Sequence, residues 1–389
     1  MSSLRSIKFS DTVRYRKNIK PFGINAISES GTPYLHYKLP RSDVLDGHNL
    51  VHYFKAEADG DAAADDVFHS NIASIWRSLR VQVGSEDVQN VLQAGHLQVI
   101  LDNLYMKSDE RNSRAVIAQG IPALSASGTA TKYGHRLLRG GFLDNLIPLY
   151  KIPQVEVIFE LNQNLAEHTN ATTAVTEVDI TSPQLTLAMI RSKELRGKID
   201  GGNYQITFTD WDLFEDTSLL SGASSHTVVV PASHKSVTGI VLTMRNTADI
   251  NDPNWGDDKY ESAYLTNALA KLHFIIDGEQ IPKESIDCTS NVELYDYLVE
   301  FAGGQENVGE WFDGAYDTAT DGKFVLFFPL NGEPFCRDTV SGTDLNSKTG
   351  QIQIEMTQMT ASANSQIRGW VRYDRVVQFG TDGGVVVSK

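Results

Sequence analysis

The chain has 389 residues, of which 41% are apolar and 21% charged, a composition that is typical of globular proteins and excludes a disordered chain. Its length allows two domains of about 190 residues each. The net charge of −15 argues against a surface that binds nucleic acid or anionic lipid throughout. No bilayer-spanning apolar run or secretory signal is recognisable, and two cysteines are too few for a disulfide framework, so we expect the protein to be made in a reducing cytoplasm.

Residues 1–30 are expected to form an N-terminal arm, with a short helix over Ile7–Ile19. The first part of this arm carries a single acid, Asp11, and six basic residues: Arg5, Lys8, Arg14, Arg16, Lys17 and Lys20. Because the rest of the chain is acidic, the arm is the segment that suits an anionic partner. A solvated tail explains the same charges equally well.

The segment Ile75–Val88 predicts a strand, a tight turn at Gly84-Ser85 and a short return, because apolar and polar residues alternate along it. The same pattern recurs at Ala268–Ile281, with Leu272 in the place of Leu79 and Ile281 in the place of Val88. A recurrence of this kind predicts an internal repeat, which has to be recognised before any fold is assigned.

Other segments repeat in the same order at nearly the same spacing. They are His36–Ser42 with Thr227–Ser233, the strand around Val51 with that around Leu242 (Val51 on Leu242), His96–Tyr105 with Asn291–Phe301, Phe142–Tyr150 with Phe324–Gly332, and Val155–Leu161 with Gln351–Thr357. Many short strands in two similar sets predict an all-β chain of two tandem eight-stranded jelly rolls with short helices and long apical loops. The expected divisions are the arm at 1–30, a first roll at 31–196, a linker at 197–202 and a second roll at 203–389.

The sequence contains no phosphate-binding loop, nucleophile elbow or zinc-protease helix motif, so no catalytic residues, metal site or cofactor are predicted. His36 and His52 fall on predicted strands and are expected to be packed or edge residues. Acidic loops leave calcium binding open, around Asp59–Asp66, Asp252–Asp258 and Asp317–Asp321.

Long connections at Lys107–Gly141, Ala248–Ala263 and Gly303–Asp321 predict large loops on a rigid scaffold. Trp255 and Trp311 lie in two of these loops and are candidate interface anchors. As sugar platforms, the same tryptophans would instead suit a carbohydrate-binding β-sandwich protein or a glycosidase.

The series of segments resembles the double jelly-roll major capsid proteins of tailless icosahedral viruses. The resemblance covers residues 30–380 and rests on HSNIASIWRSLRVQVGSEDV with its helical return and on FLDNLIPLYKIPQVEVIFELN before ITSPQLTLAMI. In the second half it rests on LAKLHFIIDGEQIP, KFVLFFPLNG, SGTDLNSKTGQIQIEMTQM and RGWVRYDRVVQF. No single motif is diagnostic, and the length favours a bacteriophage.

This resemblance implies a structural virion protein without enzymatic activity, made in the host cytoplasm, that forms pseudo-hexagonal homotrimeric capsomers. Its implied partners are itself, neighbouring capsomers, and penton and minor capsid proteins. The basic arm would face the interior and meet an inner membrane or the genome. The alternative within the virion is a vertex or spike component, although the duplicated halves favour the main tile.

Overall fold

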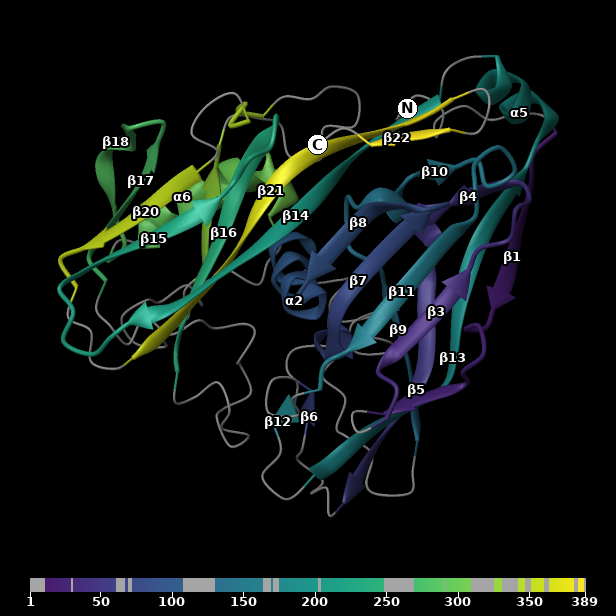
Figure 1. Cartoon of the computed structure of the whole chain (residues 1–389), viewed down its shortest axis with the longest axis horizontal. Helices are drawn as coiled ribbons and strands as arrows, with labels where there is room; N and C mark the ends of the chain where they lie inside the picture. Colours follow the sequence, from purple (N-terminus) through teal and green to yellow (C-terminus); the bar gives the residue numbers. More distant parts are fainter. Residues whose placement is uncertain are drawn as a thin grey trace.

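The structure, a computed structural model, describes residues 11–28, 31–60, 67–68, 72–107, 130–163, 169–170, 175–201, 204–247, 269–289, 291–308, 325–330, 342–346, 351–359, 364–380 and 384–387. Two β-sandwiches lie side by side, and the long ribbon of β14 (Tyr204–Leu219) and β21 (Ser365–Phe379) runs between them (Figure 1). The predicted all-β double jelly roll is confirmed.

In the first roll, one sheet has the order β3 (Tyr34–Lys38), β11 (Val155–Leu161), β7 (Trp76–Val83) and β8 (Glu86–Leu92). The facing sheet is built on β13 (Val175–Arg191). Along one edge of β13 lie β5 (Val51–Gly60) and β4 (Val44–Asp46), and along the other lie β1 (Val13–Ile19) and β2 (Ala26–Ser28). The sheet is completed by β9 (Thr131–Arg136) on β5 and β10 (Leu146–Ile147) on β4, and a separate pair joins β6 (Val67–Phe68) to β12 (Thr169–Asn170).

The second roll repeats this plan. One sheet has the order β15 (Ser225–Pro231), β20 (Gln351–Thr357), β17 (Lys271–Ile276) and β18 (Glu279–Asp287). The other has the order β14, β21, β16 (Val237–Asn246) and β19 (Val325–Pro329), with β22 (Val385–Val387) on β21. By position in the sheets, β1, β13, β5 and β9 of the first roll therefore correspond to β14, β21, β16 and β19 of the second.

Helices occupy the same place in both rolls. Helix α2 (Ala94–Tyr105) follows β8 and helix α6 (Asn291–Ala302) follows β18. Leu97, Leu101 and Leu104 of α2 are buried, as are Leu294, Leu298 and Phe301 at the matching positions of α6. A third helix, α5 (Lys193–Asp200), joins the rolls, and short 3-10 turns lie at η1 (Gly47–Asn49), η2 (Ile72–Ile75), η4 (Phe142–Asp144) and η5 (Gln305–Asn307).

The repeated hairpin follows directly from its sequence. Gly84 has a positive φ of 65°, and in the second roll Asp277 and Gly278 have φ of 57° and 80°. Positive φ in a two-residue connection matches the right-handed twist of the flanking strands. The alternating residues all face the roll cores and are buried, namely Leu79, Val81, Val83, Leu272, Phe274 and Ile276.

The N-terminal arm differs from the prediction. Val13–Ile19 forms strand β1 and not a helix, because the free edge of β13 supplies it with a continuous antiparallel ladder from Val13↔Arg191 to Ile19↔Leu185. Tyr15 donates a hydrogen bond to Asp43 at 2.6 Å, and the Asp11 carboxylate accepts hydrogen bonds from the Ser192 hydroxyl and the Lys193 amide. Long-range pairing thus overrides the local pattern.

The predicted linker and long loop also contain regular structure. Residues 197–200 belong to α5, whose first turn is capped by the Ser192 hydroxyl accepting from the Leu195 amide at 3.1 Å. Buried Leu195 and Ile199 hold this helix against the body. The expected loop Lys107–Gly141 ends in strand β9.

Two details of the repeat are wrong. Phe142–Tyr150 does not match Phe324–Gly332, because β19 pairs with β16 in the place where β9 pairs with β5. Val51 does not match Leu242, because the His52 ring points into the core and stacks on Phe159, so its neighbour Val51 faces outward, whereas Leu242 is buried in the core. A slip of one residue in a strand exchanges the two faces, and sequence similarity in short apolar runs does not resolve it.

Candidate functional site

The contact between the two rolls is the surface from which an assembly of rolls can be argued. Strand β8 and turn η4 of the first roll lie against β14 of the second (Figure 1). The buried Gln89 side chain accepts from the Phe142 amide at 3.1 Å and donates to the Thr209 carbonyl at 3.3 Å, while the Thr209 amide donates to the Gly140 carbonyl. The rings of Phe142 and Phe208 meet edge to face at 5.5 Å. These paired backbone and amide groups make the two rolls one packed unit.

A buried ion pair lies at this contact. The Asp210 carboxylate, which is fully buried, accepts from Arg375 at 2.8 Å and from the Tyr373 hydroxyl at 3.1 Å. Burial raises the pKa of Asp210, and Arg375 opposes that shift. Because a buried charge without a partner is costly, Arg375 must stay in place for Asp210 to be ionised.

Helix α2 presses its other side onto β21. The ring of His96 packs edge to face on Trp370 at 5.1 Å, and Arg368 donates to His96 Nδ1 at 3.4 Å. Trp370 in turn donates its indole hydrogen to the Leu92 carbonyl at 3.2 Å. Of the α2 side chains that the structure describes, all but Asp102 are buried.

Asp210 and Asp212 test the glycosidase alternative within the described residues. Both carboxylates accept from the Tyr373 hydroxyl, and Asp212 also pairs with His234 at 2.6 Å. Glycoside hydrolysis needs two carboxyl groups on either side of the scissile bond. Asp210 is buried and ion-paired, so only Asp212 faces the groove beside β8. The pair therefore anchors the ribbon and does not have the arrangement of an acid and a nucleophile.

The described basic residues of the predicted arm are all exposed. Arg14 and Arg16 lie on β1 with their side chains on the outer face of the sheet, since they pair with Ile190 and Ala188 and alternate with Tyr15, which packs on the core. Lys17 and Lys20 are also exposed. Arg5, Lys8, Trp255 and Trp311 lie outside the described residues, so their roles stay predictions.

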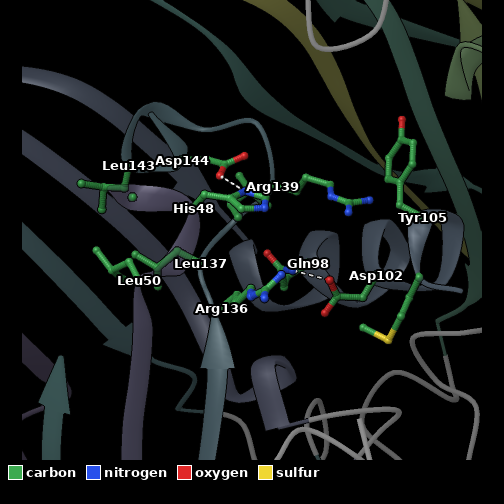
Figure 2. Close-up of a pocket in the computed structure, with 13 residues that line it drawn as sticks. His48, Leu50, Gln98, Asp102, Tyr105, Arg136, Leu137, Arg139, Leu143 and Asp144 are labelled. Carbon is green, nitrogen blue, oxygen red and sulfur yellow. Dashed lines mark hydrogen bonds and ion pairs between the residues drawn. The ribbon is translucent and has the colours of Figure 1, made fainter. Parts of the chain in front are cut away.

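A cavity opens between η1, η4, the end of β9 and α2 (Figure 2). His48 pairs with Asp144 at 3.0 Å across its rim, Gln98 donates to Asp102 at 2.6 Å, and the Arg139 guanidinium lies 5.3 Å from the centre of the Tyr105 ring. Its volume is about 50 Å³, enough for water but far below the several hundred Å³ that small-molecule sites have. The charged side chains named here already have partners, so we interpret the cavity as a water-sized gap between these elements.

The first core contains a pair of histidines. His52 Nδ1 lies 3.3 Å from His135 Nε2, which also accepts from the Trp76 indole at 2.8 Å. The Tyr37 hydroxyl lies 2.9 Å from His52 Nε2. Burial, and then the neighbouring His135, lower the pKa of His52 well below its ordinary value. His52 is therefore a packed core residue, as predicted, and its neutral form is the one that the core accepts.

No group of three or more His, Cys, Asp or Glu side chains is arranged for a metal ion in the described ranges. Most carboxylates of the acidic loops considered for calcium lie outside those ranges. The helices seen in the described part are too short or too polar to cross a bilayer.

Sequence reasoning missed one feature. On α6, Glu293, Asp296 and Glu300 recur at the spacing of one helix face, and the last two are exposed. The signal was readable as the acids of NVELYDYLVEFA, but only the position of the helix in the fold gives this face a meaning.

No protein-family model matches the chain, and no curated protein sequence matches it. Solved structures do. The PBCV-1 protein VP54, fitted into a reconstruction of the virophage Sputnik, has a TM-score of 0.69 at 10% identity, covering 99% of this chain and 98% of VP54. The Faustovirus major capsid protein has a TM-score of 0.68 at 8% identity, covering 95% and 91%. The mavirus major capsid protein has a TM-score of 0.52 at 12% identity, covering 98% and 91%.

The chain therefore has the double jelly-roll fold of these viral major capsid proteins along nearly its whole length. At such low identity the likeness establishes the fold, and the capsid role has to be argued from the surfaces. Origin from a bacteriophage stays a prediction.

Proposed function

We propose that the chain is the major capsid protein of an icosahedral virus and that three copies form a pseudo-hexagonal capsomer. The observation that carries this proposal is the repeat itself: two rolls of the same plan, packed head to tail with β8 and α2 of one against β14 and β21 of the next. A head-to-tail contact forms a ring when its rotation closes. Six similar rolls from three chains supply such a ring.

The same surfaces support a structural role without enzymatic activity. The described side chains with strongly shifted pKa values, such as Asp210, His52 and Arg372, are buried and bonded within the fold. In this proposal the partners are further copies, neighbouring capsomers, and penton and minor capsid proteins. The assembled protein lies in the virion after synthesis in the host cytoplasm.

The basic N-terminal segment is proposed to face the interior of the shell, where Arg5 and Lys8 would meet the genome or an inner membrane. Strand β1 begins at Val13 and carries the predicted arm residues Arg14, Arg16 and Lys17, so a deletion of residues 2–10 tests Arg5 and Lys8 while leaving the strand in place. A variant lacking residues 2–10 should still form capsomers but assemble fewer shells; normal shells without the segment would contradict the role.

The solution mass of the purified chain tests the main proposal. Light scattering on a sizing column should give three times 43.0 kDa, unchanged on dilution, because obligate interfaces bury about 2,000–5,000 Å². Electron microscopy should then show shells. A stable monomer would contradict the capsomer and would direct attention to sugar binding by the loops of Trp255 and Trp311.

A further inference from the structure

The contact between the two rolls of one chain suggests how two chains can contact each other. Its first side is β8 with α2, and its second side is the outer face of β14 and β21. On that outer face Trp211 and Leu213 line a groove of about 260 Å³ together with Asn90 and Leu92 of β8. Two corresponding surfaces take no part in this contact: β18 with α6 in the second roll, and β1 with β13 in the first. They lie at opposite ends of the molecule (Figure 1).

The first of these unused sides is α6 with β18. Helices α2 and α6 have equal length and matching buried positions, yet every described α2 side chain except Asp102 is buried, whereas Val292, Asp296 and Glu300 of α6 are exposed. Val292 at the start of α6 is 74% exposed, and Ile281, which pairs with Phe274, is 37% exposed although Gln89, which pairs with Val81 in the first roll, is buried. The α6 face that corresponds to His96 and Val99 of α2 carries Glu293 and Asp296, followed one turn later by Glu300. The exposed face of α6 is thus partly apolar and strongly acidic.

The second unused side is β1 with β13. Where β14 presents Trp211 and Leu213 away from its own core, β1 presents Arg14 and Arg16. Beside them on β13 lie Ala188, which is half-buried, and Ile190, which is buried. In the described part of the chain, no carboxylate forms an ion pair with Arg14 or Arg16. Lys55 and Lys132 lie on the same outer face, and the acids Glu57 and Asp179 follow them toward the other end of β13.

We infer that the acidic face of α6 docks on the Arg14–Arg16 face of β1 in a second copy of this chain. The contact repeats the head-to-tail packing of β8 and α2 on β14 and β21, with opposite charges in place of the buried aromatic contact. Charge complementarity of this kind selects the partner and its register more than it adds affinity. The aromatic contact within a chain and the charged contact between chains therefore use different side chains and do not replace each other. This inference rests on the proposed capsomer and names the surfaces that close it.

The test is a charge exchange. Arg14→Glu with Arg16→Glu should raise the dissociation constant of the trimer at least tenfold, because the acidic face of α6 then meets an acidic strand. Asp296→Lys with Glu300→Lys should do the same. The chain that carries all four substitutions should regain the trimer, because both surfaces are reversed. Light scattering over a dilution series gives the readout, and circular dichroism and thermal melting show whether each variant is folded.

A matched control places two reversed charges elsewhere on the first roll. Lys38→Glu with Arg77→Glu changes the other sheet, where both side chains are about half exposed, and should leave the trimer unchanged. Mixing the two dissociated variants gives a second test. Three subunits cannot alternate two kinds in a closed ring, so the mixture should not restore full trimers even though its heterotypic contacts are attractive.

The outcomes separate the two proposals. A wild-type monomer would refute the capsomer. A wild-type trimer that tolerates both double variants would refute the docking surface alone. If the fourfold variant folds and stays dissociated, the charges do not face each other and the inference fails. If only shell formation or nucleic-acid binding is lost in the Arg14 and Arg16 variant, β1 serves another partner.

Discussion

At the scale of single residues, the buried polar groups decide how the protein responds to pH and mutation. His52 and His135 form hydrogen bonds with each other, with Tyr37 and with Trp76. This buried core disfavours a positive charge on His52. Asp210 and Arg375 of the second roll form a buried ion pair beside the contact between the rolls. Such groups stabilise the fold only while their protonation states and partners are maintained.

The histidine pair predicts an acid-sensitive first roll. His52 has a pKa well below its ordinary value of 6.5, so below that pH the unfolded chain binds a proton that the folded chain does not. The stability contributed by neutral His52 is present above pH 6.5 and is lost as the pH falls, at up to about 1.4 kcal/mol per pH unit. Guanidinium unfolding at pH 5, 6 and 7 measures this slope.

His52→Gln provides the comparison for that slope, since an amide can still accept from Tyr37 and donate to His135. This variant should be less stable at pH 7 and should show a smaller loss between pH 6.5 and 5. An equal slope in both proteins would mean that other groups cause the acid sensitivity.

Removal of the Asp210 carboxylate should weaken the joint between the rolls. Asp210→Ala leaves the Arg375 guanidinium without its buried carboxylate partner, and the free energy of unfolding should fall by about 3 kcal/mol. The exposed, bidentate Arg80–Asp87 pair is the control, since Asp87→Ala should cost less than about 1 kcal/mol. Equal losses measured by chemical denaturation would contradict the structural role of the buried pair.

At the scale of elements, strand β1 is the least expected feature. Asp43 is buried and accepts from Tyr15, Arg191 and Arg196, so the strand is tied to β4, β13 and α5 at once. These partners and its ladder on β13 make β1 the counterpart of β14 and part of the first roll.

Truncation distinguishes a strand from an arm. Removal of residues 2–10 leaves strand β1, which begins at Val13, in place, so it should change the melting temperature less than the longer truncation does. Removal of residues 2–20 should cost at least about 2 kcal/mol and promote aggregation, because Asp43 loses a donor and the edge of β13 becomes free. Thermal melts with turbidity measure both; equal behaviour would mean that β1 is dispensable.

At the scale of the whole molecule, the two rolls are similar in plan and different in surface. The ribbon of β14 and β21 is buried on both faces along much of its length because the first roll covers it, whereas β1 keeps Arg14 and Arg16 exposed. A head-to-tail assembly uses that difference. The loss of trimers on charge reversal, and their return in the fourfold variant, are the predictions that belong to this scale.

The sequence by itself determined the double jelly roll. Alternation at Leu79–Val83 and Leu272–Ile276, the turn residues and their recurrence are local properties, and period-two patterning fixes which residues a strand buries. It also indicated a helical return after the first hairpin and a packed or edge position for His52. It did not identify β1, the match of β9 with β19, or the register at Val51, because these depend on pairing partners more than seventy residues away.

Only the tertiary structure decided which surfaces are used. The acids of α6 are visible in the sequence, but nothing local shows that α2 is buried while Asp296 and Glu300 of α6 are exposed, or that Arg14 and Arg16 lie on a sheet face and not on a free tail. Burial and pairing are properties of the packed chain, since the same residue is stabilising or costly according to what lies against it. The sequence therefore specified the two rolls, and the packing of one roll on the other identified the faces on which a further copy can dock.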